Sequence, residues 1–316
     1  MRKVPILFII FNRLDTVMQS FEPIRWYKPE KLYIAADGPR KNKTGEAERC
    51  QEVREWVLDH IDWQCSVLTL FRDENIGCGQ GPKQAIDWLF DNEEMGVILE
   101  DDCVASDSFF EFAYQMLMRY RDDKRISIIC GSNFDKNGDY QVKDADYFFS
   151  VVPYTWGWAT WRRNWVDYDY SMSSWSTINH KKLLKFISLN KDHQNYWRYV
   201  FDTTAQSIPN DIWDYQFFYM CYRRRQFSIV PNCNLISNIG YDKDATHISR
   251  DSVYEQIKRK GSLVFPIKHP KKLIRNINYD NLVLDFCYGR IPSIPIIKLI
   301  KRFIKRKLLI FTFNES

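Results

Sequence analysis

The sequence lacks the short cysteine and glycine motifs that mark the commonest metal and nucleotide sites. Its eight cysteines are scattered, with no Cys-x-x-Cys pair and no cysteine and histidine spacing typical of zinc. We therefore interpret them as reduced, mostly buried thiols of a cytosolic protein. A glycine-rich turn at 75–83 matches neither the GxGxxG of nicotinamide-binding proteins nor the GxxxxGKS/T of P-loop proteins, so neither type of cofactor site is expected.

Long apolar runs are also missing, and no window reaches the length of a transmembrane span. Residues 1–11 begin with basic residues and continue into an apolar run, as a signal peptide does. This run is short, however, and it leads into polar residues without a small-residue cleavage site. We therefore predict that it forms a first buried strand.

The charges are nearly balanced. A formal net charge of +5 is too mild to argue for nucleic acid, which is not expected as a partner. Hydrophobic residues make up 45% of the chain and aromatic residues 16%, which indicates a globular protein and not a disordered one. Aromatic side chains are therefore plentiful, and they can either stack on sugars and bases or fill a core.

Strand-like and helix-like patterns alternate through the first half of the chain. This alternation predicts an α/β fold with a mostly parallel, Rossmann-like sheet and helices on both of its faces. From about Asp146 the alternation is lost and Trp and Tyr become dense, so the second half should be more irregular and helical. Strands are expected at 5–11, 31–36, 65–71, 97–99 and 126–130. Helices are expected from a cap at Asp15 or Thr16 towards residue 24, and at 46–59, 82–90, 108–120, 181–188 and about 212–225.

The strongest functional signal is a run of three acids, Glu-Asp-Asp at 100–102, directly after the short apolar strand at 97–99. Adjacent carboxylates repel one another unless a positive charge compensates them. Hard oxygen ligands suit Mg²⁺ or Mn²⁺, and ligands of open α/β sheets gather at the carboxyl ends of the strands. The alternative is a solvated acidic turn before a helix that Ser108 and Glu111 cap together.

Other predicted strands also end in polar residues, and in such a sheet these ends would line one crevice. The first strand ends in Asn12-Arg13 and the second in Asp37-Gly38. Arg13 and Asp37 could grip a base or a ribose there. The turn at 75–83 offers backbone N–H groups and a helix N-terminus to an anion.

These features follow one another in a fixed order: a strand ending in Arg13, the Asp37-Gly38 turn, an Asn-x-Gly turn, and the acids 100–102 followed by Phe-Phe-Glu-Phe. The sequence thereby resembles the GT-A glycosyltransferases, and among them the inverting N-acetylglucosaminyltransferase I type. Further matching pieces lie at 156–158, 212–215 and 236–247, so the resemblance spans about residues 4–247. The turn at 75–83 is more similar to bacterial family 2 enzymes.

The resemblance implies an inverting transfer from a nucleotide-diphosphate sugar, with a UDP-sugar such as UDP-N-acetylglucosamine as the expected donor and Mn²⁺ or Mg²⁺ as the cofactor. Asp102 would bind the metal, His247 would contact the metal or a phosphate in a segment that closes over the diphosphate, and Asp214 would be the catalytic base. Donor-binding roles are implied for Arg13, Asp37, Asn75, Lys83, Glu100, Asp101, Gly157, Trp158 and Trp213.

Several of these assignments have alternatives. Asp211 could be the base, or it could cap a helix in whose first turn Asp214 stabilises the helix dipole without catalysis. His247 could be an exposed loop residue. Trp158 could form a sugar-stacking wall or belong to the core.

The expected organisation is one GT-A domain over 1–250, followed by an extension over 251–316. Residues 1–130 would form the nucleotide-sugar half of the domain and residues 131–250 the acceptor half.

The extension carries a basic amphipathic pattern over 291–313. On a helix, Ile297, Ile300, Ile304 and Leu308 fall on one side and the lysines and arginines on the other. This pattern is typical of a helix on an anionic membrane surface, and it also suits a helix docked on the protein. We expect a cytoplasmic enzyme held at the inner face of the cytoplasmic membrane, where it acts on a glycan or lipid-linked glycan in surface polysaccharide synthesis.

Two other functions fit parts of the pattern. A sugar-1-phosphate nucleotidyltransferase uses a related sheet, but it would need a glycine-rich basic loop after the first strand, which residues 11–14 lack. A non-catalytic sugar-nucleotide-binding scaffold would bind a donor without turning it over.

Overall fold

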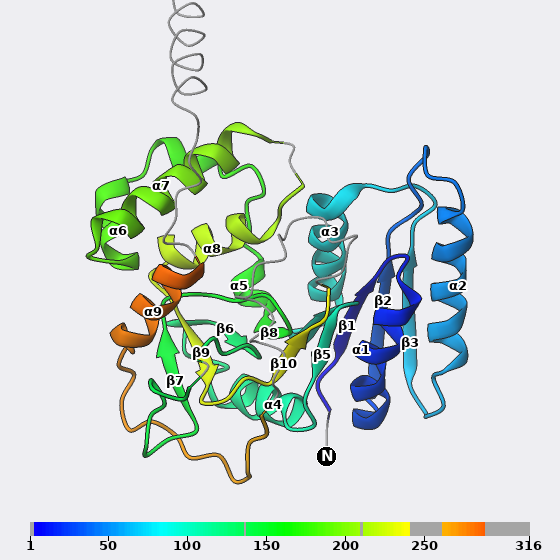
Figure 1. The fold of residues 1–316 in the computed structure, drawn as a ribbon, viewed down its shortest axis with the longest axis horizontal. Coiled ribbons are helices and arrows are strands. Elements are labelled where there is room, and N and C mark those ends of the chain that lie inside the picture. Colours follow the sequence, from blue (N-terminus) through cyan, green and yellow to red (C-terminus); the bar gives the residue numbers. More distant parts are fainter. Residues whose placement is uncertain (1–2, 136, 209–210, 241–260, 288–316) are drawn as a thin grey trace, which may run out of the picture.

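The computed structural model describes residues 3–135, 137–208, 211–240 and 261–287, and its centre is an eight-stranded sheet (Figure 1). The strands lie in the order β3-β2-β1-β4-β8-β6-β9-β7, and a separate two-stranded sheet joins β10 to β5. The strand bounds are β1 Ile6–Ile10, β2 Lys31–Ala36, β3 Ser66–Phe71, β4 Met95–Glu100, β5 Cys103–Ala105, β6 Ile126–Cys130, β7 Tyr147–Ser150, β8 Trp158–Trp161, β9 Phe227–Pro231 and β10 Ile236–Asn238.

Helices cover both faces of the large sheet. Strand β1 shows this alternation, because Leu7 belongs to the core under α3, α7, α8 and α9, whereas Ile6 and Phe8 belong to the core under α1, α2 and α4. A strand buried on both faces reads as a continuous apolar run, as β1 does. The helix bounds are α1 Leu14–Tyr27, α2 Glu46–Asp59, α3 Gly77–Asn92, α4 Phe109–Arg119, α5 Arg162–Trp165, α6 His180–Ile187, α7 Lys191–Gln206, α8 Asp214–Arg223 and α9 Ile277–Cys287, with a 3₁₀ turn η1 at Ser173–Ser176.

The predicted α/β class is confirmed. Strands β3, β2, β1 and β4 run parallel, as do β6 and β9, so the sheet is mostly parallel. Strand β8 is antiparallel to both of its neighbours, β4 and β6, and β7 is antiparallel to β9. All five predicted strands are present, whereas β5 and β7 to β10 were not predicted.

The predicted cap of the first helix is wrong, and the two caps considered as alternatives, at Ser108 and Asp211, do not form either. Helix α1 begins at Leu14 after Arg13, so neither Asp15 nor Thr16 is its cap. Ser108 precedes α4 without a side-chain capping bond, because its hydroxyl accepts a hydrogen bond from the backbone N–H of Leu263. Helix α8 follows Trp213, so Asp211 does not cap it.

The segment from residue 261 to α9 wraps around the sheet edge near β7 and leads the chain into the core (Figure 1). Asn276 donates from its backbone N–H to the carbonyl of Phe149, and Tyr279, Val283 and Leu284 of α9 are fully buried. The part of the predicted extension that the structure describes is therefore packed against the domain. Among the described helices, none is long and apolar enough to cross a membrane. The predicted helix over 291–313 lies outside the described residues.

Candidate functional site

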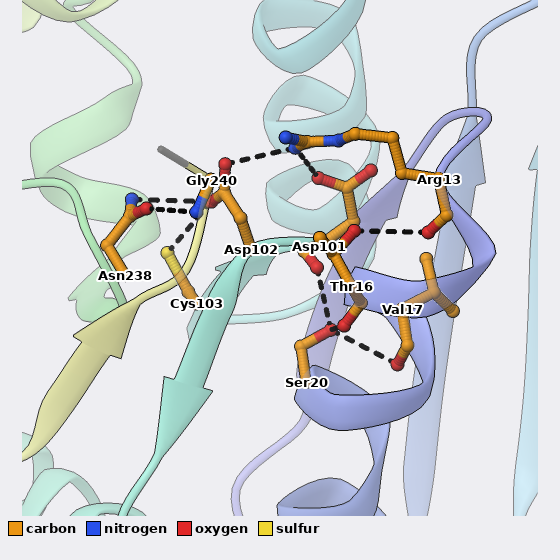
Figure 2. A network of polar contacts seen from close by, with 9 residues as sticks. All are labelled: Arg13, Thr16, Val17, Ser20, Asp101, Asp102, Cys103, Asn238 and Gly240. Atoms are coloured by element: carbon orange, nitrogen blue, oxygen red, sulfur yellow. Dashed lines mark hydrogen bonds and ion pairs between the residues drawn. The ribbon is translucent and has the colours of Figure 1, made fainter. Parts of the chain in front are cut away.

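The acids 100–102 lie where β4 ends and turns into β5, and the guanidinium of Arg13 lies against two of them (Figure 2). Arg13 immediately precedes α1, and its Nη2 atom contacts Oδ1 of Asp101 and, at 3.0 Å, Oδ2 of Asp102. The hydroxyl of Ser20, about two turns further along α1, donates to the backbone carbonyl of Asp101 at 2.9 Å. Two strand ends and one helix start therefore fix the position of this turn.

The electrostatics of this turn are dominated by its three carboxyl groups. Burial raises the pKa of Glu100 to about 8, helped by the negative charges of Asp102, Asp101 and Asp214. Burial also raises the pKa of Asp101 to about 6, although Arg13 opposes the shift. Burial lowers the pKa of Arg13, but the two aspartates outweigh this effect and raise it overall. Among the described residues, Arg13 is the cation that contacts this turn, and it pairs with Asp101 and Asp102, so within this part of the chain the cluster carries more negative than positive charge.

Strand β10 brings a second segment of the chain over Asp102. Asn238 pairs with Cys103 in the β5–β10 register, and its side-chain amide donates to Oδ1 of Asp102 at 3.4 Å. Gly240 lies so close that a Cβ on it would stand 2.2 Å from Oδ2 of Asp102. A glycine is therefore required at position 240. The pattern Asn-x-Gly at 238–240 could have pointed to these two residues, but we predicted no role for either of them from this pattern.

The segment 240–247 was predicted to close over a diphosphate. His247 belongs to this segment and lies outside the described residues, as do residues 241–260. Its predicted contact with metal or phosphate therefore stays a prediction. Among the described residues, no three acidic, cysteine or histidine side chains converge as a metal-binding group.

Asp37 follows β2 at the same edge of the sheet as the acidic turn, and its carboxylate is bound by the chain itself. Its carboxylate accepts hydrogen bonds from the backbone N–H groups of Gly38 at 3.0 Å and of Ile76 and Gly77 at 3.1 Å each. Burial raises the pKa of Asp37, and these donors oppose the shift. The expectation that this helix N-terminus offers free donors to a ligand is thus wrong for Ile76 and Gly77, because Asp37 already occupies them.

Asn75 and Lys83 also make contacts within the chain. The amide of Asn75 donates to the carbonyl of Gly38 at 3.0 Å, so Asn75 joins the end of β2 to the turn before α3. The ammonium of Lys83 lies 2.5 Å from the carboxylate of Asp87, one turn further along α3. Asp87 in turn accepts from the indole of Trp165 at 2.8 Å.

Helix α8 brings a further carboxyl group towards the acids 100–102. Asp214 is its first residue, is partly exposed and accepts a hydrogen bond from the backbone N–H of Tyr215 at 2.9 Å. Its negative charge contributes to the raised pKa of Glu100, so the two carboxyl groups lie within electrostatic reach of each other. The structure therefore brings Asp214 together with the acidic run, although the two are far apart in sequence.

Asp211 lies close to the start of α3. Its Oδ1 atom lies 3.2 Å from the position that a Cβ on Gly77 would take, at the start of α3. Cys78 is close to the same acids: although the residue is exposed, partial desolvation of its thiol raises the pKa, and so do the charges of Asp211, Glu100 and Asp37. Cys78 received no role from the sequence, because a lone thiol in a turn carries no motif.

Trp158 and Trp213 lie behind the site and not on its surface. Their rings stack with centroids 5.9 Å apart, and Trp158 is fully buried against Trp165 and Phe217. The prediction that Trp158 forms a sugar-stacking wall is wrong for this structure, because a ring without exposed surface offers no face to a sugar. Trp213 is 6% exposed and belongs to the same aromatic core.

Gly157, the residue before β8, lies against β10, the strand that carries Asn238. Its φ of +57° lies in the left-handed region, and a Cβ there would stand 2.3 Å from Cδ1 of Ile236 in β10. Its carbonyl accepts a hydrogen bond from the N–H of Gly131 at 2.8 Å. Gly157 thus lets β10, which carries Asn238, pack closely on the sheet.

No family model matches the chain, and no curated protein matches it. Among solved structures it is similar to a mannosyltransferase, PcManGT from Pyrobaculum calidifontis in complex with GDP-Man and Mn²⁺, with a TM-score of 0.37 and 14% identity over 52% of this chain and 46% of that one. It is also similar to S. aureus TarS 1-349, with a TM-score of 0.37 and 9% identity over 53% of this chain and 49% of that one. A third is HddC from Yersinia pseudotuberculosis, with a TM-score of 0.32 and 10% identity over 56% and 87% of the two chains. The chain spans about half the length of the first two, and likenesses at such TM-scores carry no weight for function.

Proposed function

We propose that the protein is a metal-dependent, inverting glycosyltransferase that uses a nucleotide-diphosphate sugar. The observation that carries the proposal is that Asp214, at the start of α8, lies within electrostatic reach of Glu100 at the carboxyl end of β4, beside Asp101 and Asp102. An inverting transfer is a single in-line displacement at the anomeric carbon. It requires a base for the acceptor hydroxyl and positive charge on the departing diphosphate. Asp214 is the candidate for the base, and a cation held by Asp102 is the candidate for the positive charge.

The donor set of the acidic turn fits a divalent cation. Mg²⁺ and Mn²⁺ commonly bind through one or two carboxylates and complete their shell with substrate phosphates and water. Asp102 is partly exposed, and the excess of negative charge around it is the condition that such an ion relieves. Asp102 would hold the ion, and the ion would stabilise charge on the diphosphate. His247 remains the proposed second contact.

Asp214 is the proposed base, since its partly exposed carboxylate can accept the proton of an acceptor hydroxyl. Arg13 holds Asp101 and Asp102, and Asp37 holds the turn before α3, so we assign both to positioning the site. Glu100 and Asp101 remain the proposed contacts of ribose or sugar hydroxyls. UDP-N-acetylglucosamine is the first donor to test.

The acceptor and the location of the enzyme belong to the same proposal and rest on the sequence pattern over 291–313 alone. A basic amphipathic helix there would hold the enzyme on the anionic inner face of the cytoplasmic membrane, beside a lipid-linked or surface glycan. Flotation with anionic and neutral vesicles, for the full chain and for a chain that ends at residue 290, tests this point. Equal flotation of both chains would contradict it.

Thermal-shift and calorimetric titrations of UDP, GDP and dTDP, each with and without Mn²⁺, test the catalytic proposal. We expect one diphosphate to bind and to do so more tightly with Mn²⁺. Asp102→Asn should remove the effect of the metal. Asp107→Asn, which changes an exposed acid just after β5, should keep it and is the matched control. Failure of all three diphosphates to bind would overturn the proposal.

A further inference from the structure

A hollow lies at the edge of the sheet opposite the acidic turn. Helix α1 starts beside that turn and runs for 14 residues to Tyr27, a rise of about 20 Å at 1.5 Å per residue. There the hydroxyl of Tyr27 accepts a hydrogen bond from the N–H of Val4, just before β1. The hollow, which we term the Trp26 pocket, has a volume of about 270 Å³ and is lined by Glu22, Arg25, Trp26, Lys28 and Asp62.

The indole of Trp26 is unusually open to solvent, with 77% of the residue exposed. The other face of α1, which includes Val17, Phe21 and Ile24, is fully buried against the sheet. Tryptophan is mostly buried in folded proteins, because its ring is large and apolar. An exposed indole beside a hollow is the kind of surface on which the apolar face of a sugar ring stacks.

The polar groups around the indole are held in place. The guanidinium of Arg25 donates from Nε and Nη2 to Oδ2 of Asp62, at 3.1 and 2.6 Å, and its Nη1 donates to Glu22 at 3.4 Å. These contacts join the end of α1 to the turn after α2. A ligand would therefore meet donors and acceptors that are already paired with one another along the rim of the pocket.

The formal charges of the lining cancel. Glu22 and Asp62 are acidic, whereas Arg25 and Lys28 are basic. A pocket without net charge has no preference for a phosphate or for a metal ion. Carboxylate oxygens and guanidinium N–H groups beside an apolar ring instead suit a neutral ligand rich in hydroxyl groups.

The backbone at Lys28 points the same way. Lys28 has a φ of 53° and a ψ of 65°, in the left-handed region where helices commonly end on glycine. A side chain at such a position costs about 1 kcal/mol relative to the right-handed conformation. Lys28 is nevertheless present at this position and is one of the residues that line the pocket.

From these observations we infer that the Trp26 pocket binds a neutral sugar ring of a glycan. The ring would stack on the indole, and its hydroxyl groups would hydrogen-bond to Glu22, Arg25 and Asp62. This binding requires neither a metal nor a nucleotide. It therefore does not rest on the proposed transferase activity.

Titration of the ¹⁵N-labelled indole signals with maltohexaose, chitohexaose and mannohexaose, without metal or nucleotide, tests the inference. The Trp26 signal is assigned as the one missing from Trp26→Phe. We expect at least one of the three glycans to shift this signal saturably. Calorimetry should show binding weakened about tenfold or more in Trp26→Ala and largely kept in Trp26→Phe. Met18→Ala changes another exposed residue of α1, outside the pocket lining, and should bind as the unchanged protein does.

The inference would be overturned if no glycan shifted the Trp26 signal, or if Met18→Ala lost as much binding as Trp26→Ala. A saturable shift with inorganic phosphate in place of the glycans would also overturn it. So would a shift of the signal on dilution alone, which would mean that two copies of the chain contact each other here. Glu22→Gln, which keeps the shape of the pocket, should also weaken binding. Asp102→Asn should leave glycan binding unchanged, so this result stays separate from the outcome for the transferase.

Discussion

Asp214, at the start of α8, lies within electrostatic reach of Glu100, at the end of β4: burial and the charges of Asp102 and Asp101 raise the pKa of Glu100, and the charge of Asp214 adds to the shift. Asp214 lies in the irregular second half of the chain and Glu100 in the parallel half of the sheet. The site therefore combines a carboxyl group from the end of β4 with one from the start of α8. The first prediction separates their roles.

Asp214→Asn should leave UDP binding in the presence of Mn²⁺ within about twofold of the unchanged protein, because the metal-binding acids stay in place. Transfer should fall by about 10²–10⁴-fold, the usual contribution of a general base. Binding is measured by calorimetry and transfer by release of UDP in the presence of an acceptor. Asp211→Asn is the matched control. Loss of transfer in Asp211→Asn alone would move the base to Asp211.

The binding of a divalent cation should strengthen as the pH rises from 6 to 8. Because burial and mutual repulsion raise the pKa of Glu100 from 4.5 to about 8, the folded protein binds more protons than the unfolded chain in this range. The metal-free protein should therefore lose stability as the pH rises towards 8. A cation competes with these protons and relieves the repulsion, so it stabilises the protein most at pH 8.

Thermal unfolding with and without Mg²⁺ at pH 6, 7 and 8 measures this effect. The increase in Tm caused by Mg²⁺ should grow with pH in the unchanged protein and should be much smaller and flat in Asp102→Asn. The same increase at all three pH values would mean that the acids 100–102 do not titrate on metal binding.

The parallel half of the fold could be predicted from the sequence because its strands are buried on both faces. Strands β1, β2 and β4 each carry a continuous apolar run, as expected for a strand whose two faces are both buried. The polar ends of these strands then placed Arg13 and the acids 100–102 in one crevice. This part of the site follows from local patterns and from the general geometry of parallel sheets.

Other elements depend on contacts that no local pattern reveals. Helix α3 begins at Gly77, five residues before the predicted start at Pro82, because the distant carboxylate of Asp37 accepts its first N–H groups. Helix α7 was missed although Tyr196, Trp197, Val200 and Phe201 are spaced as on one helical face. Aromatic and β-branched residues have modest helix propensity, and packing in the aromatic core overrides it.

Asp37→Asn should loosen the turn before α3. An amide can accept only through its oxygen, so at least one of the N–H groups of Gly38, Ile76 and Gly77 would face a donor. The protein should lose about 1–3 kcal/mol of stability, and the amide protons of Ile76 and Gly77 should exchange faster. Denaturant unfolding and hydrogen exchange measure the two effects. Asp73→Asn, an exposed acid before the same turn, should change neither; equal loss in both variants would remove Asp37 from this role.

Gly157→Ala should destabilise the protein by about 3 kcal/mol, because the new methyl group would require both a left-handed backbone and a shift of Ile236. The same strand carries Asn238, so metal binding at Asp102 should weaken as well. Gly45→Ala is the matched control, since its φ is +71° but the nearest atom is the mobile guanidinium end of Arg49 at 3.3 Å. It should cost about 1 kcal/mol, for the backbone alone.

The double variant Gly157→Ala, Ile236→Ala separates crowding from backbone strain. Truncating Ile236 alone leaves a cavity and destabilises the protein, but in the double variant the new methyl group at 157 enters that space. The loss of stability in the double variant should therefore be smaller than the sum of the two single losses by about 1 kcal/mol or more, as expected for residues in direct contact. Denaturant unfolding of the four proteins in the cycle measures this coupling. Additive losses would mean that the strand β10 does not press on Gly157, and the close packing that places Asn238 and Gly240 over Asp102 would need another cause.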